Sequence, residues 1–219
     1  MEKNKMTVLI PSMLDFHFPL LQYAFNSKHY TAVVLDNEND ITKIGLRYTH
    51  NDLCYPAILI IGQMISALQS GDYDLNKTIL LIPQAGDACR GSNYIHMIRK
   101  ALKKAGFANV PIISLNFKGL ESDNKFSITL GMVRRAVAAI MYGDLLMILK
   151  NQIEPYEVIK GQTTKYIDKW ITYLGAEIKS GKDLSVFCIK KMFRSISNDF
   201  KNVGQQEKNI KKVGIVGEL

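Results

Sequence analysis

Two cysteines, Cys54 and Cys89, stand where a polar loop is predicted to lead into a helix. Cys54 precedes a Tyr-Pro pair and an apolar segment in LRYTHNDLCYPAILIIGQMISAL (residues 46–68), and Cys89 lies in GDACRGSN. Helix N-termini carry partial positive charge and free N–H groups, which favour thiolate, the form that binds iron or zinc. The pair is a candidate metal or cluster site. Because a separation of 35 residues matches no compact ligand spacing, two small buried side chains are the alternative.

Residues beside the two cysteines extend this candidate site. Gly86 and Gly91 flank Cys89 and would let the backbone approach a cluster. Arg47 and Arg90 are candidates to pair with phosphate groups or to offset the charge of a thiolate-ligated cluster, with surface salt bridges as the alternative.

Other polar residues give weaker indications, and no catalytic residue is predicted. The candidates near the same edge are His50, Asp87, Ser12 and His17. Their spacing does not support a Cys-His-Asp hydrolase. Cys188, inside the apolar helical stretch LSVFCIKKMF, is predicted to pack in the core.

The elements around these residues alternate between strand and helix. Apolar strands are predicted at residues 6–12, 31–36, 78–84 and 110–116, helices at 18–25, 55–69 and 94–106, and a polar loop from Asn37 to about Asp52. Asn51 or Asp52 is expected to cap the helix after Cys54, and Pro56 suits its first turn. The pattern indicates an α/β fold, with a Rossmann- or flavodoxin-like parallel sheet. Both cysteines would then lie beyond the carboxyl ends of the strands, where such sheets bind ligands.

The character of the chain changes after Lys118. Residues 127–150, 163–180 and 183–203 predict three helices punctuated by Gly161 and Gly181, with Trp170 and Tyr173 as candidate anchors. The expected organisation is an α/β domain at 1–120, a helical subdomain at 121–205, and at 206–219 the start of a further α/β unit, because KKVGIVGEL reads as a strand without its helix.

Composition limits the partners. The chain has 219 residues, 47% of them hydrophobic, and a net charge of +8, but its basic residues are not interleaved with aromatic ones. We therefore expect no nucleic-acid binding, and we expect no membrane span because the apolar runs are short. Three cysteines without an export signal favour the cytoplasm.

Four segments of the chain resemble the 2-hydroxyacyl-CoA dehydratase superfamily. They are LIPSMLDFHFPLL, GLRYTHNDLCYPAILIIGQMISAL, ILLIPQAGDACRGSNYIHMIRKAL and KKVGIVGEL, and NDLCYPA and GDACRGSNY are the most specific pieces. The chain looks most like the module that is joined to an activase-type ATPase in large proteins described as CoA-substrate-specific enzyme activases.

The resemblance implies a [4Fe-4S] cluster with Cys54 and Cys89 as its first two ligands. In the family the third ligand comes from a later α/β unit, and an ATP-hydrolysing activase supplies the electron. We therefore expect a module for electron transfer or catalysis that is inactive alone. Its expected partners are the activase-type ATPase or the remaining domains of the same protein. Whether it binds acyl-CoA and whether it forms a dimer are left open. The alternatives are a non-catalytic interaction module and a redox-sensing dithiol.

Overall fold

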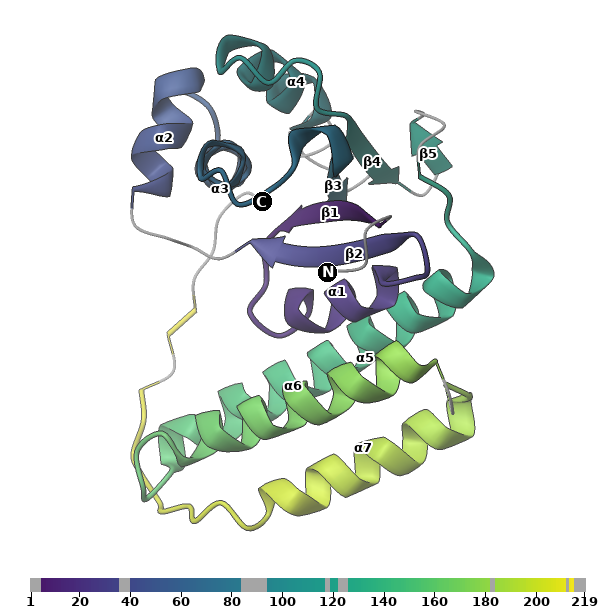
Figure 1. Cartoon of the computed structure of the whole chain (residues 1–219). Coiled ribbons are helices and arrows are strands. Elements are labelled where there is room, and N and C mark those ends of the chain that lie inside the picture. The colour runs from purple at the N-terminus through teal and green to yellow at the C-terminus, as the bar shows by residue number, and fades with distance from the viewer. Residues whose placement is uncertain are drawn as a thin grey trace. The chain divides into compact units, whose positions relative to one another are not determined.

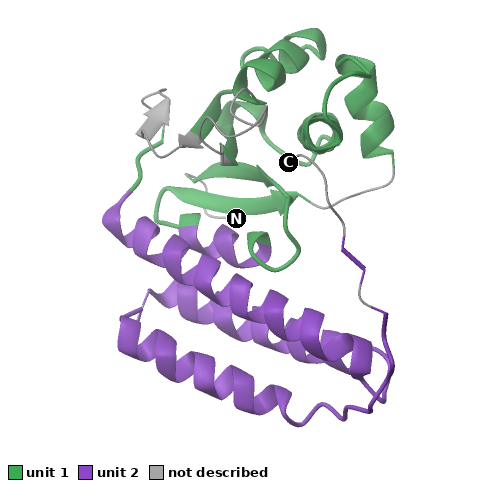
Figure 2. Ribbon diagram, turned by 180° about the vertical axis from the view of Figure 1, so that it is seen from behind, with its two compact units in different colours: residues 1–18, 25–128 green, residues 19–24, 129–219 purple. Residues whose placement is uncertain are grey.

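The computed structural model describes residues 5–35, 40–83, 94–116, 119–121, 126–181, 184–211 and 213–214. The chain divides into two compact units (Figure 2). Residues 1–18 and 25–128 form the first unit, and residues 19–24 and 129–219 form the second. The expected domain boundary at residue 120 lies eight residues before residue 128, where the first unit ends. Of the expected further α/β unit at 206–219, residues 212 and 215–219 lie outside the described residues.

The first unit is built on a sheet with the order β2-β1-β3-β4-β5. Its strands are β1 (Met6–Pro11), β2 (Tyr30–Leu35), β3 (Thr78–Pro83), β4 (Ile112–Asn116) and β5 (Gly119–Glu121). The first four strands are parallel, and the short β5, which the sequence did not predict, pairs antiparallel with β4. This confirms the predicted α/β class, and the order of the first four strands is that of a flavodoxin-like sheet.

Burial explains why these segments are strands. Val8, Leu9 and Ile10 are all buried, as are the four residues from Ile79 to Ile82, so side chains on both faces of the sheet are removed from water. Continuous apolar runs of this kind are typical of parallel strands covered on both sides. On one face the sheet is covered by α3 (Tyr55–Gln69) and α4 (Tyr94–Lys104) (Figure 1). Apolar side chains of the strands and of these two helices form a hydrophobic core there.

The predicted loop from Asn37 to Asp52 is wrong in its middle, because residues Ile41–Tyr48 form a helix, α2. Its apolar side chains recur at helical spacing, and α2 packs closely on α3. Two glycines make this crossing close. A Cβ on Gly45 would overlap the carbonyl oxygen of Ile58, and one on Gly62 would overlap that of Ile41.

The second unit contains three long helices in the part of the chain where the sequence predicts helices. They are α5 (Leu130–Ile153), α6 (Gln162–Ser180) and α7 (Val186–Phe200), and a short 3-10 turn, η3 (Glu154–Tyr156), follows α5. Most of α1 (Phe18–Phe25) also belongs to this unit. Gly161 and Gly181 bound α6 with φ angles of 82° and 66°, a left-handed conformation that favours glycine. Among the described residues, no helix is both long and apolar enough to cross a membrane.

Glu157 holds the N-terminus of α6. Its carboxylate accepts hydrogen bonds from the backbone N–H groups of Gly161 and Thr163. Hydrogen bonds from Thr163 and Gly161, with a smaller contribution from the charge of Lys208, lower the pKa of Glu157 below its ordinary value of 4.5. An anion at this position satisfies helix N–H groups and complements the helix dipole.

We predict that Gly62→Ala destabilises the first unit by about 2 kcal/mol, because the new methyl group cannot fit against backbone. Gly131→Ala is the matched control. Its Cβ would meet only Thr129 Oγ1 at 3.8 Å, so alanine there should be neutral or slightly stabilising. Urea unfolding of both variants measures the difference, and equal stabilities would show that the helices separate at little cost.

We predict that Glu157→Gln lowers the melting temperature near neutral pH. Since the folded-state pKa is depressed, ionised Glu157 stabilises the fold above its ordinary pKa of 4.5, and this stabilisation is lost as the pH falls through the folded-state value. The gap between wild type and variant should therefore close on acidification. Thermal unfolding followed by circular dichroism tests this, with the exposed Glu207→Gln as control. A gap independent of pH would contradict it.

Candidate functional site

Cys54 is the N-cap residue of α3. Its carbonyl oxygen accepts hydrogen bonds from the N–H groups of Ala57 and Ile58 at 3.1 and 3.2 Å, and Pro56 lies in the first turn. The expectation that Asn51 or Asp52 caps this helix is therefore wrong, since the chain turns into the helix only at Cys54. The side chain is half-buried against the core of the first unit.

The Cys54 thiol contacts the start of another helix. Its Sγ lies 3.3 Å from the hydroxyl oxygen of Tyr94, the first residue of α4. Tyr94 is five residues after Cys89 in the sequence, and α4 is the helix that follows β3. Cys54 thus contacts the side chain of the first described residue that follows Cys89 in the sequence. Cys89 itself, with Gly86, Asp87, Arg90 and Gly91, lies outside the described residues.

The other predicted residues near Cys54 are more exposed. Arg47, in the last turn of α2, lies over the ring of Tyr48 with its Cζ 5.7 Å from the centroid. His50 is exposed and borders a cavity of about 420 Å³, which Cys54 itself does not line. This cavity is lined by Tyr48, Thr49, His50, Asp52, Leu53, Met97, Lys100 and Lys104. Its walls are mainly apolar, and two lysines make it suitable for an anion with an apolar part.

Gln63, which sequence reasoning missed, fixes the chain at the end of β1. Its Oε1 accepts from the N–H of Ser12 at 2.8 Å, and its Nε2 donates to the carbonyl oxygen of Ser12 at 3.1 Å. The order of the strands reverses between β1 and β3, so Ser12 lies at the switch point where such sheets bind ligands. In the sequence, the feature that could have indicated this role is that Gln63 is a polar side chain within the otherwise apolar run of α3. His17, also predicted near this edge, is buried just before α1.

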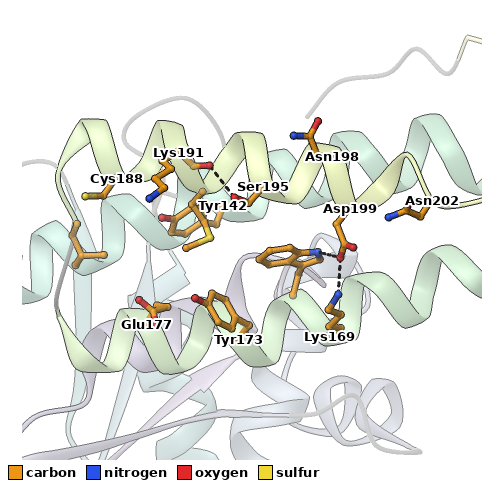
Figure 3. A pocket seen from close by; sticks show the side chains of 13 residues that line it. Tyr142, Lys169, Tyr173, Glu177, Cys188, Lys191, Ser195, Asn198, Asp199 and Asn202 are labelled. Carbon is orange, nitrogen blue, oxygen red and sulfur yellow. Dashed lines mark hydrogen bonds and ion pairs between the residues drawn. The ribbon is translucent and has the colours of Figure 1, made fainter.

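A second concave surface lies between α6 and α7 of the second unit (Figure 3). We call it the α6–α7 groove, with a volume of about 860 Å³. The side chains lining it include Tyr142, Lys169, Trp170, Tyr173, Glu177, Cys188, Lys191, Met192, Ser195 and Asp199. The prediction that Cys188 packs in the core is wrong, because its half-buried side chain lines this groove. Trp170 and Tyr173, predicted as anchors, line it as well.

Polar contacts organise the α6–α7 groove. Asp199 Oδ2 accepts from Lys169 Nζ at 2.7 Å and from Trp170 Nε1 at 2.9 Å, which links the two helices (Figure 3). Burial, with smaller contributions from nearby Glu177, Cys188 and Tyr173, raises the pKa of Tyr142 to about 12. The Tyr142 hydroxyl therefore stays protonated at neutral pH. It is suited to hydrogen bonding rather than to acting as a base.

The donor atoms near Cys54 partly fit a cluster. The thiol stands at a helix N-terminus, and the Tyr94 hydroxyl is at hydrogen-bonding distance from the sulfur, a contact of the kind that tunes iron–sulfur clusters. Within the described ranges, no group of three or more histidine, cysteine or acidic side chains is placed to hold a metal ion. A cluster here would need Cys89 and further ligands, all beyond the described residues.

Comparisons with protein-family models, with curated proteins and with solved structures found no match. The resemblance to the dehydratase superfamily therefore stays a prediction.

We predict that Gln63→Leu destabilises the first unit by about 1–3 kcal/mol. The replacement leaves the N–H and carbonyl groups of Ser12 without their partner in a closed environment. Amide hydrogen exchange at Ser12 should accelerate together with the loss of stability in urea. Gln69→Leu, in the same helix, is the control: it removes only an exposed hydrogen bond to the Tyr48 hydroxyl and should change neither quantity appreciably. Unchanged exchange at Ser12 would show that Gln63 does not hold this loop.

Proposed function

We propose that this chain is an iron–sulfur module for electron transfer or catalysis, related to the 2-hydroxyacyl-CoA dehydratases. Cys54 and Cys89 are the proposed ligands of a [4Fe-4S] cluster. The observation that carries the proposal is the position of Cys54, an N-cap thiol that lies 3.3 Å from the hydroxyl of the first described residue after Cys89 in the sequence.

Three features of the first unit support this assignment. The first is the helix N-terminus, whose partial positive charge stabilises the negative charge of a thiolate-ligated cluster. The second is the Gln63–Ser12 contact, which steadies the loop at the switch point of the sheet. The third is the Tyr94 hydroxyl, which lies 3.3 Å from the sulfur of Cys54, a proposed ligand. When bound, the cluster supplies one-electron chemistry, and this chain's residues hold and shield it.

The module is proposed to act with other protein parts. Two cysteines leave the cluster short of the three that the family uses, so the remaining ligation and the electron come from an activase-type ATPase or from further domains. A cytoplasmic setting suits the proposal because reducing conditions keep thiols available. The cavity bordered by Lys100 and Lys104 is the proposed place for an anionic substrate such as an acyl-CoA. The chain alone is proposed to be inactive.

We predict that the chain, reconstituted anaerobically with iron and sulfide, carries one [4Fe-4S] cluster per chain or per pair of chains. Cys54→Ser and Cys89→Ser should each abolish most of the bound iron, while Cys188→Ser, a matched substitution in the second unit, should retain it. Iron and sulfide analysis with electron paramagnetic resonance of the reduced protein gives the readout.

Two outcomes would reject the proposal. Iron content equal in all three variants would show adventitious binding. No iron in the wild type, with a disulfide between Cys54 and Cys89 on oxidation, would favour a dithiol switch instead. Circular dichroism of each variant confirms that loss of iron is not loss of fold.

A further inference from the structure

The long helix α5 carries a second apolar face, on which several large side chains are exposed in the described part of the chain. Leu130 is 77% exposed and Val137 is 51% exposed, and four other large apolar side chains of α5 are also exposed: Val133, Ile140, Met141 and Ile148. From residue 130 to residue 148 the only charged residues are Arg134, Arg135 and Asp144. Contiguous exposed apolar surface of this kind marks an interaction site.

These side chains form one straight stripe. Successive residues of an α-helix are rotated by about 100°, so positions 130, 133, 137, 140, 144 and 148 share one face. The buried residues of α5, among them Ala138, Ala139, Tyr142 and Leu146, lie on the opposite face. A helix that is apolar on both faces is normally enclosed on both. We call the exposed stripe the outer α5 face.

The outer α5 face is complementary to the same face of a second copy that runs in the opposite direction. Leu130 and Ile148 lie equally far from Ala139 along the helix, and so do Val137 and Met141. Arg134 and Asp144 are also related in this way. In an antiparallel pair of α5 helices crossing at the level of Ala139, Leu130 therefore lies opposite Ile148 and Val137 opposite Met141. Arg134 of each copy lies opposite Asp144 of the other. A two-fold interface requires this property.

From this register we propose that the outer α5 face binds a second copy of this chain, as an antiparallel helix pair with a two-fold axis at the level of Ala139. The spacing of three and four residues is that of coiled-coil seams, and the stripe from residue 130 to residue 148 extends over about 27 Å. The two symmetric Arg134–Asp144 contacts fix the antiparallel direction, because a parallel pair would place like charges opposite each other. This inference is independent of the cluster proposal.

The test is the mass of the full chain in solution, measured by sedimentation equilibrium over a range of concentrations. The wild type should form a dimer, and Val137→Glu should raise its dissociation constant about ten-fold or more by placing charge in the seam. Val186→Glu is the matched control, since Val186 is equally an exposed valine at 67% exposure but lies on α7. The control should dimerise like the wild type.

Charge exchange tests the direction of the pair. Arg134→Glu and Asp144→Arg should each weaken the dimer, and the double variant should restore it, because the pairing is recreated with its signs exchanged. Circular dichroism confirms that each variant is folded. A monomeric wild type, a dimer that tolerates Val137→Glu, or a double variant no better than the single ones would overturn the proposal.

Discussion

The close crossing of α2 and α3 is the contact on which the proposed site depends. Backbone meets backbone at Gly45 and Gly62, so nothing larger than hydrogen fits at either position. The crossing packs α2 beside the N-terminal half of α3, and the loop between the two helices delivers Cys54 to the helix N-terminus. The thiol is therefore positioned by helix packing, not by the strands that give the fold its class.

Gln63 connects this helix pair to the sheet. The residue lies one position after Gly62, and its side chain bonds both backbone groups of Ser12. One turn of α3 thus makes a close backbone contact with α2 on one side, at Gly62, and hydrogen bonds to the end of β1 on the other, through Gln63. The same turn therefore joins the helix that carries Cys54 at its N-terminus both to α2 and to the end of β1.

The sequence predicted the strands because continuous apolar runs such as TVLIP and ILLIP leave few alternatives. It did not predict α2, since an eight-residue helix gains most of its stability from packing, here against α3. The Gln63 contact was missed because its partner is 51 residues away along the chain. The prediction that Cys188 is a core residue was wrong because its helix buries Ile189, Ile196 and Phe200. That helical register leaves the cysteine half-buried in the α6–α7 groove.

The two faces of α5 show why hydropathy alone could not reveal its interfaces. Both faces are apolar, so periodicity does not distinguish the packed face from the exposed one. Side-chain size does not separate them either, because the packed face buries large residues such as Tyr142 and Leu146 beside small ones such as Ala138, Ala139 and Gly143. What separates the two faces is their solvent exposure, which the fold sets and the sequence of a single helix does not. The small buried residues allow close helix approach within the second unit, whereas the exposed branched residues are spaced to pack against another helix.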